Sequence, residues 1–247
     1  EEFSVTELAD FRRYSRLGND KEVKDLVATN LAISGFRDRS FETEYPGDNE
    51  DRVLSTLVHD AVVEAYRNNT ELDEDGFYRF ISSSMNEMAE DAEGLDTDIL
   101  LRDNVYGRSL SDAVEDISGY YADSFTRGLE VETEKVLENN GFFGRADILR
   151  EIDGEMELRD IKTRYSENIA VPGPLDEFKM GCYALLSMND EEIDRFVLEY
   201  PVQGVEVDVE PEDWLGEVSD TAKEFDELLE DSRERQDELL RERLGLK

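Results

Sequence analysis

Residues 144–163 read GRADILREIDGEMELRDIKT, two apolar-leaning runs joined by Asp153 and Gly154. An Asp-Gly pair between two such runs is a strong signal for a β-hairpin with a two-residue loop. In that hairpin Ile152 pairs with Glu155, and each further pair is found by stepping one residue outward along both strands. The stretch therefore predicts both a hairpin and its register.

This register brings two acids face to face. Asp147 is predicted to lie directly opposite Asp160, where Cβ atoms are roughly 4.5 to 5.5 Å apart and like charges destabilise the sheet. A divalent cation would neutralise both carboxylates, and Lys162, two residues beyond Asp160, is predicted to share their face. The alternative is a solvated, charged hairpin face, and a one-residue change of register would put the two acids on opposite faces.

The surrounding sequence predicts an α/β fold. Period-two alternation indicates a three-stranded meander, and a helix and two further strands follow it. We expect a single domain over residues 1–247, with a central mixed sheet flanked by helices. The predicted strands are 129–137, 142–150, 155–163, 195–202 and 205–209, and the predicted helix after the meander is 176–188.

The two ends of the chain are predicted to be helical. Ser4 and Glu7 have the spacing of a capping box, which predicts a short helix. Apolar residues recur at helical spacing in 52–69, and residues 71–128 are mostly helical in pattern without a motif. An acidic amphipathic helix is predicted from Glu217 onward. The expected regions are a mainly helical region with His59 (1–128), an α/β core (129–209) and a C-terminal acidic helix (210–247).

Acidic residues dominate the composition. The chain has 64 Asp and Glu against 27 Lys and Arg, a formal net charge of −37, and yet 38% hydrophobic residues. That is too apolar for a disordered acidic chain. Acids spread along the whole sequence are typical of a halophile's cytoplasmic protein, because in molar salt the Debye length falls to roughly 3 Å and like charges repel less. The alternative is an acidic protein that binds basic partners.

Cysteine content and hydropathy argue against a disulfide-rich protein and against a membrane protein. Cys182 is the single cysteine, which excludes an internal disulfide and argues against a cysteine-ligated cluster, so its predicted role is a small core residue. No run approaches the roughly 18 apolar residues of a membrane span, and nothing resembles a signal peptide. We expect a cytoplasmic protein, in a high-salt cytoplasm, without membrane contact.

The two acids of the hairpin and Lys162 resemble the motif of the PD-(D/E)XK nuclease superfamily, and their surroundings resemble its RecB-like exonuclease branch, which includes CRISPR-associated relatives. The resemblance extends over residues 3 to 188 and implies a restriction-endonuclease-like core. It also implies hydrolysis of phosphodiester bonds in DNA, assisted by magnesium or manganese. The stretches are FSVTELADF (3–11), similar to the branch's opening helix; LSTLVHDAVVEAY (54–66), similar to its histidine-bearing helix; GRAD (144–147), similar to its glycine-led first acid; and DIKT (160–163), similar to its D-x-K-T strand.

The resemblance implies a role for each residue of the site. Asp147 and Asp160 would hold the metal, joined by His59 and the carbonyl of Ile161. Lys162 would orient and help deprotonate the attacking water, or neutralise charge developing on the phosphate. Hard cations prefer such oxygen ligands, and an imidazole shifts the preference toward manganese. Without the resemblance, the only histidine of a chain is more often an ordinary, partly exposed side chain.

Four residues are implied to bind the nucleic acid: Arg145, Arg164, Lys179 and Tyr183. Lys179 stands where family members usually have the Gln of a Gln-x-x-x-Tyr motif, whereas Tyr183 keeps the Tyr, although a core position fits Tyr183 equally well. The cysteines that hold an iron-sulphur cluster in some relatives are absent at 14–17 (YSRL), so no cluster is expected.

The net charge bears on how DNA would be bound. Lys and Arg normally supply affinity by displacing counterions from phosphates, and molar salt removes most of that contribution. Binding is then expected to depend on Arg145, Arg159 and Arg164 and on the metal between carboxylate and phosphate. Glu132 and Glu134 could support the metal ligands, but acids are too frequent in this chain to single them out.

The sequence thus predicts a divalent-metal-dependent deoxyribonuclease, expected to be an exonuclease, in DNA repair, recombination, CRISPR adaptation or viral DNA processing. Its expected partners are linear or single-stranded DNA ends, with a helicase or further copies of the chain as additional ones. The first alternative is a non-catalytic RecB-like subunit that binds DNA ends within a larger complex. The second is an acidic interaction protein without a metal site.

Overall fold

The fold is described from a computed structural model, which defines ten segments of the chain. The predicted helix 52–69 is described over 59–67, where it is helical. Arg164 and the last two residues of the YSRL stretch (16–17) lie outside the described residues. The described residues are 3–15, 59–67, 75–76, 78–80, 82–83, 115–121, 131–139, 142–162, 172–188 and 192–244.

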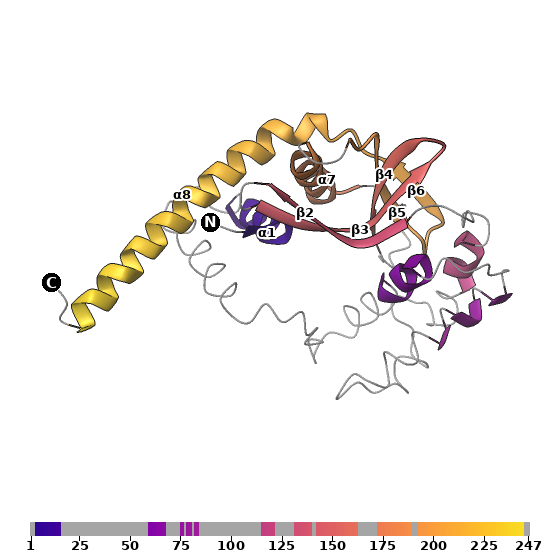
Figure 1. Cartoon of the computed structure of the whole chain (residues 1–247), viewed down its shortest axis with the longest axis horizontal. Coiled ribbons are helices and arrows are strands. Elements are labelled where there is room, and N and C mark those ends of the chain that lie inside the picture. The colour runs from indigo at the N-terminus through magenta and orange to yellow at the C-terminus, as the bar shows by residue number, and fades with distance from the viewer. Residues whose placement is uncertain are drawn as a thin grey trace.

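A mixed sheet of six strands forms the centre of the fold (Figure 1), which confirms the predicted α/β class. Strands β1, β3, β4, β5 and β6 follow one another across the sheet, and β2 pairs with β3. The β1/β3 and β4/β5 pairs are parallel, and the others are antiparallel. The strands are β1 (Phe3–Ser4), β2 (Val131–Asn139), β3 (Phe142–Ile152), β4 (Glu155–Ile161), β5 (Arg195–Tyr200) and β6 (Val205–Asp208).

The hairpin between β3 and β4 has the predicted register. Ile152 pairs with Glu155, and the ladder continues to Ile148 with Arg159. Asp153 and Gly154 both have positive φ, 54° and 89°, as a type I′ loop requires. The turn chemistry therefore predicted this register correctly, because the twist of an I′ turn matches the twist of the flanking strands.

Helices α1, α7 and α8 lie on one side of the sheet and at its end (Figure 1). α1 (Val5–Ser15) begins with the predicted capping box, in which Glu7 N–H donates to Ser4 Oγ and Ser4 N–H donates to Glu7 Oε2. α7 (Pro174–Ser187) crosses between the parallel strands β4 and β5, as such a pair requires. α8 (Glu212–Leu244) begins five residues earlier than Glu217 and extends away from the sheet at its C-terminal end (Figure 1).

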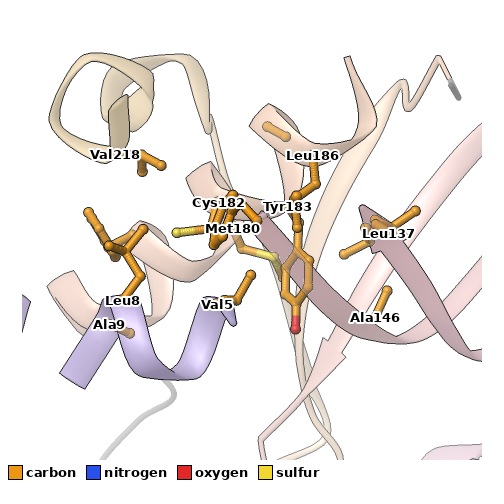
Figure 2. Packing of buried hydrophobic residues seen from close by; sticks show 14 of the residues in the cluster. Val5, Leu8, Ala9, Leu137, Ala146, Met180, Cys182, Tyr183, Leu186 and Val218 are labelled. Atoms are coloured by element: carbon orange, nitrogen blue, oxygen red, sulfur yellow. The ribbon is translucent and has the colours of Figure 1, made fainter. Parts of the chain in front are cut away.

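The main core lies between the sheet and these helices. Val5, Cys182 and Leu186 are buried together there with Val218 of α8, so Cys182 is a core residue as predicted (Figure 2). Gly144, which opens the GRAD stretch, is needed at this contact: a Cβ would lie 2.6 Å from Val5 Cγ2 and 2.8 Å from the Tyr183 ring. Any side chain at Gly144 would therefore push α1 and α7 off the sheet.

The helical segment 59–67 lies on the other side of the sheet from α7 (Figure 1). Its buried residues include Ala61, Val62 and Val63. The described pieces of 71–128 are helical as well, most clearly at 115–121. Across the ten described segments, no helix combines the length and the apolar character that crossing a membrane demands.

Candidate metal centre

The strands β3 and β4 separate at the point where the two acids of the hairpin lie. The last pair of their ladder is Ile148 with Arg159, one step short of Asp147 and Asp160. At that step the N–H of Ile161 donates to the Asp147 carboxylate, at 2.7 Å to Oδ2. A side chain thus replaces the main-chain acceptor, and the carboxylate of Asp147 is fixed at the open end of the hairpin.

The ladder between β2 and β3 is interrupted at the same level. Paired residues on both sides of the interruption place Glu134 opposite Asp147, and Glu134 has a left-handed backbone, with φ 57°. A non-glycine residue in this region is uncommon and costs about 1 kcal/mol or more, so it persists only where the surroundings impose it. Both neighbours of β3 therefore lose regular pairing beside Asp147.

These distortions bring together three groups that can bind a cation: His59, Glu134 and Asp147. One candidate ligand atom from each lies within 4.8 Å of the other two. Glu134 could not be singled out in the sequence, because nothing local marks its left-handed backbone. Two carboxylate oxygens and an imidazole nitrogen form a donor set that suits Mn²⁺, and Mg²⁺ with less preference.

His59 is held between two carboxylates. Its Nε2 lies 3.2 Å from Asp147 Oδ1, and its Nδ1 lies 3.2 Å from Asp60 Oδ1. Burial lowers the pKa of His59, but the hydrogen bonds to Asp147 and Asp60 outweigh it and raise the pKa to about 10. In the absence of a metal the imidazole is therefore charged, and it neutralises Asp147.

Asp147 uses its two oxygens in different directions. Oδ1 faces His59, and Oδ2 accepts the Ile161 N–H. Burial raises the pKa of Asp147, but His59 and the Ile161 N–H together hold that pKa below its usual value. Asp147 is therefore an ionised carboxylate, the form that binds cations.

Asp160 is paired with the side chain of a lysine. Its Oδ2 forms an ion pair with Lys162 Nζ, and both side chains are largely buried. Burial raises the pKa of Asp160, and the charge of Asp147 raises it further, whereas Lys162 and Lys179 oppose that rise. The two acids are thus close enough to affect each other, yet His59 neutralises one and Lys162 the other.

Lys162 also has a second acidic neighbour. Asp176 Oδ1, at the start of α7, lies 3.7 Å from Lys162 Nζ. Burial lowers the pKa of Lys162, but Asp160 and Asp176 reverse the effect and hold the pKa above its usual value. Lys162 is therefore an ammonium ion.

The four residues implied to bind nucleic acid have different surroundings. Arg145 is half exposed and lies with its Nε 2.6 Å from Glu134 Oε2. Lys179 is near enough to affect the pKa of Asp160. Tyr183 is buried, and its hydroxyl donates to the Arg145 carbonyl at 2.8 Å, so this side chain supports the core and β3 (Figure 2). Arg164 lies outside the described residues.

Arg159 does not line the candidate centre as expected, because it is buried on the opposite face of β4. Its side chain is 2% exposed. It pairs with Glu157, with Glu199 at 3.0 Å, and with both carboxylate oxygens of Glu206 at 2.8 and 3.0 Å. The expectation that Arg159 binds DNA is therefore wrong: alternation along the strand places residue 159 and residue 160 on opposite faces.

This buried ion network holds the helix that carries His59. Tyr66 lies two turns after His59, donates its hydroxyl to Glu199 Oε1 at 3.4 Å, and packs its ring edge-to-face against Tyr121. The Arg150 guanidinium lies 5.9 Å from the centre of the Tyr66 ring. Residues seven apart share one side of a helix, so docking Tyr66 on the sheet also directs His59 toward it.

Comparisons with known proteins do not assign the chain to a family. No protein-family model matches it, and no curated protein matches it. The functional argument therefore depends on the geometry of the centre. That geometry combines an ionised Asp147, a nearby imidazole, a second acid next to an ammonium and a half-exposed arginine.

Proposed function

We propose that this chain is a divalent-metal-dependent DNA nuclease of the RecB-like kind, with a restriction-endonuclease-like core. The observation that carries the proposal is the meeting of His59 and Glu134 with Asp147 at the open end of the hairpin, beside the Asp160–Lys162 ion pair. The motif resemblance of Asp160-Ile161-Lys162 agrees with this chemistry. The reaction is hydrolysis of a phosphodiester bond.

The residues present fit a manganese or magnesium ion. Asp147 and Glu134 offer oxygens and His59 offers a nitrogen. The motif resemblance adds Asp160, whose pKa is raised by the charge of Asp147, as a further oxygen donor. An ion held there would polarise the phosphate and lower the pKa of its bound water. The imidazole favours manganese over magnesium.

Lys162 acts as a cation rather than as a base. Its pKa is held above the usual value by Asp160 and Asp176 despite burial, so it has no free electron pair with which to accept a proton at neutral pH. Of the two roles considered for Lys162, neutralising negative charge that develops on the phosphate is therefore favoured. The water's proton would go to a carboxylate or to solvent.

DNA binding rests on few basic side chains. Arg145 is half exposed beside the centre, and Lys179 lies near Asp160. With a net charge of −37, long-range attraction of DNA is absent, and molar salt must screen the repulsion. Short-range contacts at the centre then supply the affinity, which suits capture of a DNA end better than binding along a duplex. The proposed settings are DNA repair, recombination, CRISPR adaptation or viral DNA processing, in a high-salt cytoplasm.

The test is digestion of linear and circular DNA in molar KCl with Mn²⁺ or Mg²⁺. Wild type is compared with Asp147→Asn and Lys162→Met. Loss of linear DNA alone, dependent on both residues, is the expected result. Digestion that survives both changes would place the activity elsewhere, and binding of DNA ends without digestion would favour the non-catalytic alternative.

A further inference from the structure

A buried acid outside the motif faces the ammonium of the candidate centre. Asp176 is 5% exposed, and its Oδ1 lies 3.7 Å from Lys162 Nζ. Its other oxygen, Oδ2, accepts the N–H of Gly173 at 3.1 Å, at the first turn of α7. Asp176 is thus attached to the helix by one oxygen and faces Lys162 with the other.

The two acids beside Lys162 differ in the roles that the proposed function gives them. Under the proposed function Asp160 binds the same cation as Asp147, whose charge raises the pKa of Asp160. A carboxylate oxygen that binds a divalent cation is a much weaker partner for an ammonium ion, because the cation takes its charge. Asp176 lies instead at the first turn of α7, where the Gly173 N–H donates to its Oδ2.

We propose that Asp176 is a positioning residue that holds the Lys162 ammonium at the reaction centre when Asp160 binds the metal. The inference rests on the proposed function, because it assigns a role within that same centre. Lys162 is paired with both Asp160 and Asp176, so the ion pair with Asp176 remains when Asp160 binds the metal. Its backbone is fixed independently, as the Lys162 N–H donates to the Glu199 carbonyl at 2.8 Å, so only the side chain needs a second anchor.

A simple helix cap is the competing explanation, and the two oxygens allow the roles to be separated. Asp176→Asn keeps an oxygen that can accept the Gly173 N–H but removes the charge that faces Lys162. Asp176→Ala removes both. Glu177→Gln is the matched control, because Glu177 is the next acid in the same turn and the ion pairs of Lys162 are with Asp160 and Asp176.

The first experiment measures single-turnover cleavage of linear DNA at saturating Mn²⁺ in molar KCl. We expect Asp176→Asn to be slower than Glu177→Gln by roughly 10- to 100-fold, the scale of a misplaced catalytic group. Circular dichroism should show that both variants are folded, and saturating Mn²⁺ loads the centre of both. In a Lys162→Met background, Asp176→Asn should change the residual rate by less than about twofold, because its effect acts through Lys162.

Two results would overturn the inference while leaving the nuclease proposal intact. One is a rate for Asp176→Asn equal to that of Glu177→Gln. The other is an equal loss from Asp176→Asn with and without Lys162. A wild-type chain that digests no DNA would instead overturn the proposed function. A crystal structure with Mn²⁺ bound then tests the contact directly: Lys162 Nζ should lie on Asp176, and an ammonium that stays on Asp160 alone would exclude the role.

Discussion

The Nε2 atom of His59 lies 3.2 Å from the Oδ1 atom of Asp147, so a helix from the N-terminal half of the chain and strand β3 contribute to one site. This contact neutralises one of the two acids at the end of the hairpin, and Lys162 neutralises the other. The like-charge conflict expected from the register is thus relieved by two cationic side chains.

Removal of the imidazole should weaken metal binding. His59→Ala is expected to raise the Kd for Mn²⁺ by at least about tenfold, since even residues that only support metal ligands are worth that much. Isothermal titration calorimetry in molar KCl measures the change. The control is Glu64→Gln on the same helix, whose carboxylate pairs with Arg67. Equal affinity in the two variants would remove His59 from the centre.

Glu134 is expected to increase metal affinity while its left-handed backbone lowers the stability of the fold. Because its φ is 57°, Glu134→Gly is expected to be more stable than Glu134→Ala by about 1 kcal/mol, and neither variant should bind Mn²⁺ as tightly as wild type. Urea unfolding and calorimetry measure the two effects. Glu132→Gln, an acid two residues away that pairs with Lys135, should leave Mn²⁺ affinity unchanged. Full affinity in Glu134→Gly would contradict a ligand role.

The charge of His59 predicts a pH dependence of the metal-free protein. Its pKa is 6.5 in the unfolded chain and about 10 in the fold, so its stabilisation is complete below pH 6.5 and is lost as the pH rises through 10. The melting temperature of wild type should therefore fall more steeply over this interval than that of His59→Gln. Parallel curves would show that the Asp147 contact does not form.

Metal binding should release a proton. A metal ligand must be neutral imidazole, whereas His59 is protonated in the metal-free protein at pH 7. Calorimetry of Mn²⁺ binding in buffers of different ionisation enthalpy counts the protons released. We expect about one proton from wild type and less from His59→Gln. An equal release from both proteins would place the proton on another group.

The buried ion network should be costly to break. Glu199→Gln is expected to lower the free energy of unfolding by about 3 to 5 kcal/mol, because it leaves the Arg159 charge without one of its buried partners. Lys135→Met, which removes an exposed pair with Glu132, should cost less than about 1 kcal/mol. Chemical unfolding in molar KCl measures both, and similar losses would show that water reaches Arg159.

High salt should be needed for the fold and for activity. A net charge of −37 on 247 residues repels itself strongly in dilute buffer, and molar salt screens that repulsion. Circular dichroism and DNA digestion should both reach their maximum at molar KCl and decline together on dilution. Maximal folding and activity in dilute buffer would contradict the halophilic interpretation.

Local features were predictable from the sequence because short-range chemistry determines them. The Asp153–Gly154 loop set the register of β3 and β4, and the Ser4–Glu7 spacing marked the start of α1. Period-two alternation located the meander, which places Asp147 and Asp160 at one end of a hairpin. Strand β1 was missed, since two residues pairing in parallel with a distant strand leave no periodic signal.

The candidate centre could be predicted only in part. Asp147, Asp160 and Lys162 followed from the hairpin, but Glu134 and Asp176 did not, because acids are frequent in this chain and neither belongs to a motif. Arg159 was assigned to the wrong face, although alternation from Asp160 would have placed it correctly. Because charged residues are so frequent in this chain, the sequence does not indicate which of the charged side chains are buried.

The α/β class, the hairpin and its register could be read from the amino-acid sequence, since turn geometry and side-chain alternation act between neighbouring residues. Which cation each acid faces depends on the three-dimensional packing of distant segments. His59 reaches Asp147 because Tyr66 docks on the buried Glu199, and Lys162 gains Asp176 because α7 packs beside β4. Those contacts join segments that are far apart in the chain, and burial makes their charges interact strongly enough to matter.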